Sequence, residues 1–87
     1  MDHVMNTVEK LQHILSKIIN IPAESISVSM PLIGEYAELD SMGVMILLME
    51  IENNFDIDIN DIDLSTETFT TLSSLQFSVE GAVKFLV

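Results

Sequence analysis

Residues 38–55 read Glu-Leu-Asp-Ser-Met-Gly-Val-Met-Ile-Leu-Leu-Met-Glu-Ile-Glu-Asn-Asn-Phe, and this stretch decides the fold that we predict for the chain. Asp40 and Ser41 stand directly before a long apolar run, and short polar side chains in that position are typical of a helix N-terminus. The pattern predicts a helix from about Ser41 to Asn54. The Ser41 hydroxyl should then lie at or next to the N-terminus of this helix and face water, so Ser41 is the residue that most needs an explanation.

Asp40-Ser41-Met42, at the start of a helix that ends in Glu52-Asn53-Asn54-Phe55, resembles the Asp-Ser-Leu motif and the second helix of acyl carrier proteins. An N-terminal helix, a long loop, the Asp-Ser helix, an acidic connector and a C-terminal helix follow in the order and over the length of that family. The resemblance implies an all-α fold: a small four-helix bundle of acyl-carrier type with a long first loop and a short third helix. It covers nearly the whole chain, which we expect to form a single domain over residues 1–87.

The resemblance also implies a function for the motif. In the family the serine carries a 4′-phosphopantetheine arm, which a phosphopantetheinyl transferase attaches with coenzyme A as donor. Carried over to this chain, Ser41 is the attachment residue, Asp40 acts near the metal of the transferase, and Met42 completes the motif. The thiol of the arm forms a thioester with an acyl group, so the chain should be a non-catalytic carrier.

The expected partners are the transferase and acyl-loading, acyltransferase or ketosynthase-type enzymes of a lipid or specialised acyl-transfer pathway. The phrase Pro31-Leu32-Ile33-Gly34 looks most like stand-alone carriers of specialised pathways. Typical fatty-acid carriers have acidic residues two and five positions after the serine, where this chain has Gly43 and Ile46. Apolar contact should therefore replace part of the electrostatic steering and favour one dedicated partner. A peptidyl or aminoacyl carrier and an unmodified helical docking domain are alternatives.

The composition narrows the function classes. The chain has 87 residues, no cysteine, and three basic against fourteen acidic residues, for a net charge of −11. This charge argues against nucleic acid and anionic membrane surfaces as partners and favours basic protein surfaces. The apolar run from Met42 to Met49 is too short to span a bilayer, and the chain starts without a charged segment followed by an apolar one. We expect a soluble, cytoplasmic monomer.

The other elements follow from spacing. Apolar residues three and four apart predict a first helix from about His3 to Asn20, with Asp2 as N-cap and Pro22 as the stop signal. His3 and His13 should be solvated. Residues 21–39 alternate in part like a strand, but no second strand is evident, so an ordered loop is expected to pack three side chains onto the helices, namely Ile26, Val28 and Leu32.

The C-terminal part should contain an acidic connector, one short helical turn over residues 65–69 and a final helix capped by Thr70 or Thr71. Gly81 lies inside that helix and weakens it by about 1 kcal/mol relative to alanine. The buried stripe of the final helix is predicted to consist of Leu72, Leu75, Val79, Ala82, Val83 and Leu86.

The helix after Ser41 is apolar nearly all round in its first half. Met42, Met45, Ile46 and Met49 extend the apolar surface beyond the face that can turn to the core. They either fill gaps in the core or form a flexible contact surface for a partner or an acyl chain. An acyl chain could also fold back between helices, and the candidate pocket residues, for which plain core packing is the alternative, are Leu47, Ile59, Phe69 and Leu75.

Ser41 itself has three interpretations. It can be a plain N-cap, a catalytic nucleophile or a modification site. A nucleophile needs a general base and an oxyanion hole, and Leu39-Asp40-Ser41-Met42-Gly43 is not a Gly-x-Ser-x-Gly elbow, nor does any histidine follow it. A modification site needs exposure and the positive potential of a helix N-terminus, and the resemblance favours this third interpretation.

The acidic connector permits a different class of function, a single EF-hand-like calcium-binding module at residues 56–67. Asp56, Asp58, Asn60 and Glu67 fall at positions one, three, five and twelve of a calcium loop. The match fails at the turn glycine, which is Asp61 here, and at the apolar eighth position, which is Asp63. A solvated acidic loop and a weak divalent-cation site are the other interpretations.

Overall fold

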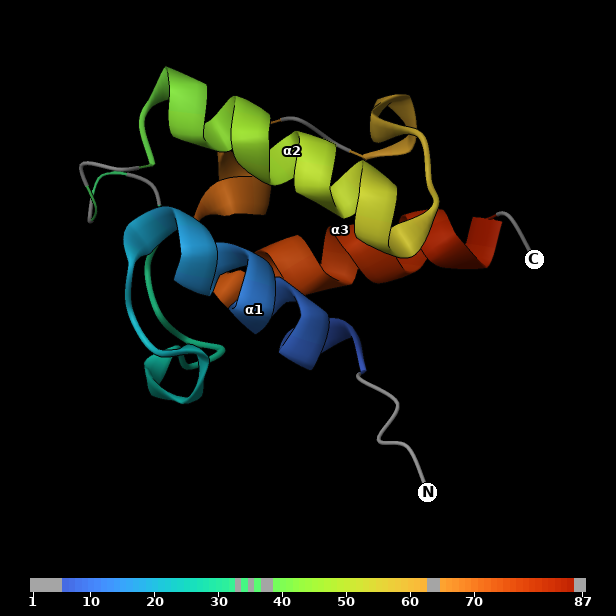
Figure 1. The fold of residues 1–87 in the computed structure, drawn as a ribbon. Helices are drawn as coiled ribbons and strands as arrows, with labels where there is room; N and C mark the ends of the chain where they lie inside the picture. Colours follow the sequence, from blue (N-terminus) through green and yellow to red (C-terminus); the bar gives the residue numbers. More distant parts are fainter. Residues whose placement is uncertain (1–5, 33, 35, 37–38, 63–64, 86–87) are drawn as a thin grey trace.

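The computed structural model describes residues 6–32, 34, 36, 39–62 and 65–85. It has three α-helices, α1 (Thr7–Ile19), α2 (Ser41–Phe55) and α3 (Leu72–Phe85), and three 3-10 turns, η1 (Ala23–Ser25), η2 (Ile59–Asp61) and η3 (Thr66–Phe69). Figure 1 shows α2 across the top of the molecule, with α1 and α3 below it. The all-helical prediction is confirmed, and the described residues form no strand. The count of four α-helices is not confirmed, because the expected short third helix is the 3-10 turn η3.

α1 begins later than predicted. Asn6 is its N-cap: the Asn6 side chain accepts a hydrogen bond from the Glu9 backbone N–H, and the Glu9 carboxylate accepts one from the Asn6 N–H. This reciprocal pair is a capping box, which satisfies two backbone donors at once. The prediction of Asp2 as N-cap was therefore wrong, and the predicted helical residues from His3 to Met5 lie outside the described residues. The helix ends at Asn20, whose backbone is left-handed (φ 59°), two residues before Pro22.

The core forms where α1 packs against both α2 and α3. Each helix contributes an apolar stripe, and the α1 and α3 stripes match the predicted spacing; Val83 is half-buried and Leu86 lies outside the described residues. The largest fully buried side chains of the molecule come from all three helices and from the first loop: Leu11, Ile14, Leu15, Ile26, Leu32, Leu47, Ile51, Leu72, Leu75 and Val79.

The first loop is fastened to the start of α3 by backbone hydrogen bonds. The Leu32 N–H donates to the Thr70 carbonyl, the Leu72 N–H to the Met30 carbonyl, and the Ser73 N–H to the Val28 carbonyl, at 3.0, 3.3 and 2.8 Å. Ile26 and Leu32 are buried as predicted. Val28 is 45% exposed, so its predicted packing onto the helices was wrong. Main-chain hydrogen bonds to the start of α3 and two buried side chains therefore hold residues 26–32 of the loop in place.

α3 starts where the sequence predicted. The Thr71 hydroxyl accepts a hydrogen bond from the Ser74 N–H at 3.1 Å, and the Ser74 hydroxyl oxygen accepts one from the Thr71 N–H at 3.0 Å. Gly81 lies on the exposed side of α3, where an added Cβ would meet nothing within 4 Å. None of the helices, over the residues described, is long and apolar enough to cross a membrane.

Candidate functional site

Asp40 and Ser41 have different positions and roles at the start of α2. Asp40 is the N-cap, and its carboxylate accepts a hydrogen bond from the Gly43 N–H at 2.9 Å. Ser41 is the first residue of the helix and is exposed. The interpretation of Ser41 as a plain N-cap was therefore wrong, because its neighbour performs that task. The Ser41 hydroxyl remains available for chemistry in the first turn of α2.

The helix N-terminus gives this hydroxyl a suitable setting for an anion. The first backbone N–H groups of an α-helix have no partner within the helix, and the helix dipole adds positive potential there. Asp40 satisfies the Gly43 N–H and adds a negative charge beside Ser41. An exposed serine at such a position can carry a phosphodiester. The geometry thus fits a phosphate-linked group on the Ser41 oxygen.

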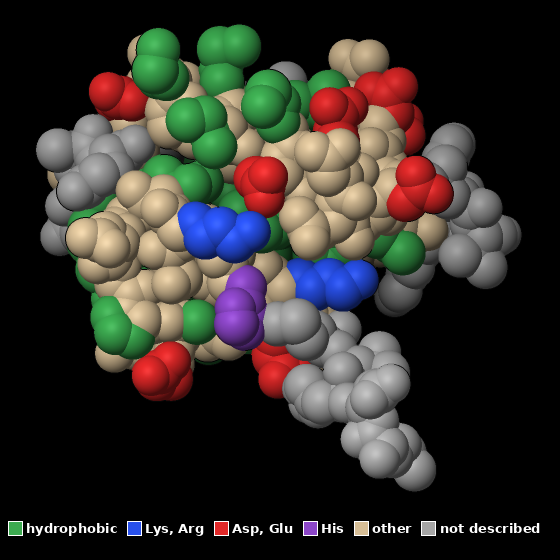
Figure 2. All heavy atoms as spheres, viewed as in Figure 1, with side chains coloured by type: hydrophobic (Ala, Val, Ile, Leu, Met, Phe, Trp, Pro, Cys, Tyr) green, Lys and Arg blue, Asp and Glu red, His purple; other side chains and the backbone are tan. Residues whose placement is uncertain are grey.

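The outer face of α2 is apolar. Met42, Met45, Ile46 and Met49 are 72, 65, 42 and 56% exposed. They do not fill the core, and their role as a contact surface for a partner or an acyl chain stays a prediction. Figure 2 shows hydrophobic side chains gathered along the upper edge of the molecule, over α2. We call these four residues the α2 apolar surface.

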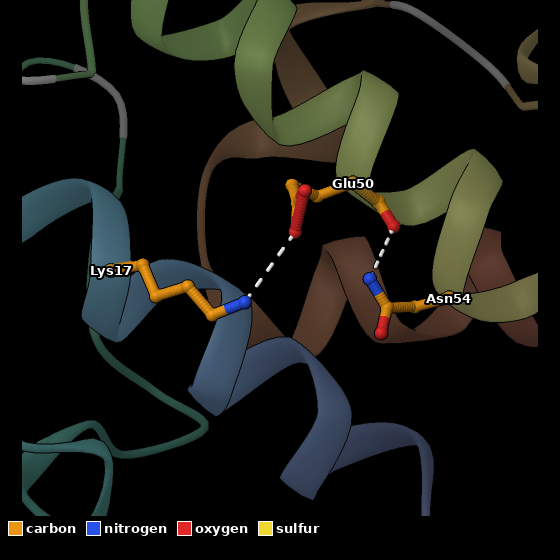
Figure 3. Close-up of polar contacts among 3 residues, drawn as sticks. All are labelled: Lys17, Glu50 and Asn54. Carbon is orange, nitrogen blue, oxygen red and sulfur yellow. Dashed lines mark hydrogen bonds and ion pairs between the residues drawn. The ribbon is translucent and has the colours of Figure 1, made fainter.

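A hollow of about 470 Å³ lies between α1 and α2, beside the start of α2. Its apolar lining comes from both helices, and a lysine and a glutamate stand at the same hollow. Lys17 of α1 pairs with Glu50 of α2, with 3.7 Å between the Lys17 Nζ and the Glu50 Oε2 (Figure 3). The lining residues are Ile14, Lys17, Ile18, Asp40, Met42, Gly43, Ile46 and Glu50.

The sequence predictions missed the α1 side of this hollow. Ile14 and Ile18 belong to the apolar stripe of α1, and the spacing that identifies a stripe does not say which of its members lie beside an open space. Lys17 is one of only three basic residues in the chain, which is the one signal that could have singled it out. Its partner Glu50 could not be found from spacing, because the two residues belong to different helices.

The predicted acyl-pocket residues lie in the core. Leu47, Phe69 and Leu75 are buried, and Ile59 is half-buried. All four belong to or pack against the one hydrophobic core cluster of the described residues. Their role in binding an acyl chain stays a prediction.

The four connector residues do not come together as a metal site. Among the described residues, no three His, Asp or Glu side chains gather in a group that could hold a metal ion, and this includes Asp56, Asp58 and Glu67. Asp58 instead caps η2, accepting a hydrogen bond from the Asn60 N–H at 2.8 Å. A calcium titration followed by NMR chemical shifts tests the calcium-binding alternative. Saturable binding at residues 56–67 would support it.

Comparisons with known proteins agree on one family. A family model described as "Phosphopantetheine attachment site" matches residues 9–75. The chain is 42% identical over 60 residues to an acyl carrier protein of Buchnera aphidicola subsp. Schizaphis graminum, covering 68% of this chain and 75% of that protein. The fold is similar to the solution structure of a holo acyl carrier protein from Nitrosomonas europaea, with a TM-score of 0.79 and 33% identity over 92% of this chain and 99% of that one.

The matched family is described by phosphopantetheine attachment, and the similar structure is that of a holo acyl carrier protein. They indicate that the cofactor of this protein is covalently attached phosphopantetheine. The chain therefore belongs to the acyl carrier protein family, whose members are carriers and not enzymes.

Proposed function

We propose that Ser41 is the residue that carries the 4′-phosphopantetheine arm, and that the protein delivers acyl groups held on this arm as thioesters. One observation carries the proposal: Ser41 is exposed in the first turn of α2, while Asp40 takes over the capping of the helix. The hydroxyl is thus neither buried nor the cap of the helix. Ser41 alone does not determine the acyl cargo, the pathway or the partner enzymes.

Attachment exchanges the phosphoanhydride bond of coenzyme A for a phosphodiester bond to the serine oxygen. The Ser41 oxygen attacks the pantetheine-side phosphorus of the coenzyme A pyrophosphate, the P–O bond to the nucleotide half breaks, and adenosine 3′,5′-bisphosphate leaves. The serine proton passes to a base of the transferase. The terminal thiol of the attached group then supplies the acyl-carrying chemistry. This chain contributes the nucleophilic oxygen, the positive end of α2 beside the new phosphodiester, and the Asp40 carboxylate next to it.

The α2 apolar surface supports docking through apolar contact. The positions that carry acids in typical fatty-acid carriers are Gly43, which is buried, and Ile46, which is exposed. The two acids that remain on α2 both have partners in this chain. Glu50 pairs with Lys17, and the Glu52 carboxylate accepts a hydrogen bond from the Ile59 N–H at 3.0 Å.

This arrangement favours a dedicated partner with an apolar surface, either an acyl-loading enzyme or an acyltransferase or ketosynthase-type enzyme. Truncating Met45 or Met49 to alanine should weaken binding to such an enzyme by at least about fivefold, as for an apolar anchor at the centre of an interface. The affinity of the wild type should change little with salt. Equal binding of this protein and a housekeeping carrier to the same general synthase would count against the dedicated partner.

Intact mass spectrometry tests the attachment residue. The protein is incubated with coenzyme A, magnesium and a broad-specificity phosphopantetheinyl transferase, beside the Ser41→Ala variant and a matched Ser25→Ala variant, in which another exposed serine is removed. We expect a mass gain of one phosphopantetheine in the wild type and in Ser25→Ala, and none in Ser41→Ala. A gain in Ser41→Ala, or no gain in a folded wild type, would overturn the assignment of Ser41.

A further inference from the structure

Three of the six methionines of the chain lie on the α2 apolar surface. Met42, Met45 and Met49 are three and four residues apart, so they are neighbours on one face of the helix. Their side chains are 72, 65 and 56% exposed. We call them the α2 methionines. The chain has no cysteine, so before the arm is attached its thioethers are the only sulfur groups that an oxidant can reach.

Met30 carries the same chemical group in a different setting. It is half-buried and packs against the hydrophobic core. The Tyr36 hydroxyl donates a hydrogen bond to the Met30 Sδ, with 3.3 Å between the oxygen and the sulfur. An oxidant reacts with a free and accessible sulfur lone pair, and here one lone pair is engaged and part of the side chain is covered. Oxidation of Met30 should therefore be slower than oxidation of the α2 methionines.

The α2 methionines lie where an enzyme must approach Ser41. Met42 follows Ser41 directly, and Met45 lies four residues, or about 6 Å along the helix axis, beyond Ser41 on the same face. Ser41 is exposed as well. An enzyme whose active site encloses the Ser41 oxygen therefore also covers Met42 and Met45.

We propose that Met42, Met45 and Met49 form an oxidation site, at which conversion of the thioethers to sulfoxides by peroxide slows the enzymes that act on Ser41. The inference rests on the proposed attachment at Ser41. In the oxidation, a sulfur lone pair attacks one oxygen of hydrogen peroxide, an S–O bond forms and the O–O bond breaks. The other oxygen leaves as water with both protons. Each sulfur loses two electrons and each peroxide gains two.

The sulfoxides change the surface of α2 and not its core. An exposed sulfoxide oxygen stays hydrated in the free protein, so the fold bears little cost. A partner that covers this oxygen must remove water from a polar acceptor, which is unfavourable in an apolar contact. Methionine sulfoxide is also reduced back to methionine by methionine sulfoxide reductases, so the change is reversible.

Peptide mapping by mass spectrometry tests the site. The protein without its arm is treated with hydrogen peroxide for increasing times, and the oxidised fraction of each methionine is measured. We expect Met42, Met45 and Met49 to be oxidised several times faster than Met30. Circular dichroism of the oxidised protein should show the helical signal of the untreated protein.

The rate of phosphopantetheine transfer tests the consequence. Peroxide is removed with catalase, and the protein is incubated with coenzyme A, magnesium and the broad-specificity transferase. The oxidised protein should be modified about fivefold more slowly than the untreated protein, or slower still. Treatment with a methionine sulfoxide reductase should restore the rate.

Two leucine variants make the test specific. In the first, Met42→Leu, Met45→Leu and Met49→Leu are combined, which keeps apolar side chains of similar volume and removes the sulfurs. Its transfer rate after peroxide should equal its own rate before peroxide. The second is Met30→Leu, which should be slowed by peroxide as much as the wild type is. Each variant is compared with itself, so a changed basal rate does not affect the result.

The opposite outcomes overturn the proposal. Oxidation of Met30 as fast as that of the α2 methionines would show that no selective site exists. Equal transfer rates before and after oxidation, or a slowed triple leucine variant, would show that the sulfoxides on α2 do not block the enzyme. Loss of the helical signal would assign the effect to unfolding. If the untreated protein gains no phosphopantetheine, the attachment at Ser41 fails first, and its control by oxidation fails with it.

Discussion

α1 and α2 begin and end alike, yet they differ in what they do with their apolar residues. Each has a short polar N-cap, Asn6 or Asp40, and each ends at a left-handed residue, Asn20 (φ 59°) or Asp56 (φ 54°). α1 buries its large apolar stripe, whereas α2 buries one face and exposes a second, the α2 apolar surface. The two helices are therefore capped in the same way. The exposed apolar side chains of α2 are not part of the core.

The difference between the buried face of α1 and the exposed face of α2 should be largest in the free energy of unfolding. Leu15→Ala on α1 removes a side chain that is 0% exposed and should lower the free energy of unfolding by about 2–5 kcal/mol, through lost burial and the cavity left behind. Met45→Ala on α2 should change it by no more than about 0.5 kcal/mol, because that side chain is 65% exposed. Urea unfolding followed by circular dichroism measures both. A cost for Met45→Ala as large as that for Leu15→Ala would show that the outer face of α2 is packed after all.

A substitution at Asp40 can give α2 the same N-cap residue type as α1. Asp40→Ala removes the acceptor for the Gly43 N–H and should cost about 1 kcal/mol of unfolding free energy. Asp40→Asn gives α2 the same kind of cap as α1 and should cost only a few tenths of a kcal/mol, since asparagine caps about as well as aspartate. Thermal unfolding measures this effect.

The same two variants separate folding from modification. The carboxylate is lost in both, so the rate of phosphopantetheine transfer to Ser41 should fall in both if Asp40 assists the transferase. A normal rate of phosphopantetheine transfer in Asp40→Asn would show that Asp40 acts only as the helix N-cap.

The helix ends differ in how well their residues tolerate a left-handed backbone. Asp56→Gly should raise the free energy of unfolding by about 0.5–1 kcal/mol, because glycine relieves the steric cost and an acid at a helix C-terminus opposes the helix dipole. Asn20→Gly should gain less, since asparagine adopts this conformation more readily and carries no charge. Denaturant titration compares the two variants. A larger gain at Asn20 would mean that the Asp56 carboxylate has a stabilising contact of its own.

The smallest effect is expected where α1 and α2 meet through charges. Lys17→Met removes the ion pair with Glu50, which joins two side chains at 3.7 Å and is largely exposed on the lysine side. The free energy of unfolding should change by about 0.5 kcal/mol or less. The melting temperature, measured at low and high salt, should therefore be nearly that of the wild type. A loss comparable to that of Leu15→Ala would make this pair a structural anchor of the two helices.

Local sequence information predicted the helices well, because their signals lie within a few residues. The period of apolar residues and the Asp-Ser and Thr-Thr starts located α2 and α3 to within a residue or two. The exposure of Ser41 also followed from its place before the apolar run. The α1 cap was missed because Asp2 and Asn6 are both acceptable N-caps, and only the capping box with Glu9 distinguishes them.

Tertiary packing decided the rest. A helical period shows which residues share a face but not which neighbour covers that face, so the sequence left open whether Met45 and Met49 were buried. Val28 was misplaced for the same reason: its backbone pairs with α3 while its side chain turns to solvent. The hollow between α1 and α2 arises from side chains about 30 residues apart in the chain, and it exists only once α1 packs between α2 and α3.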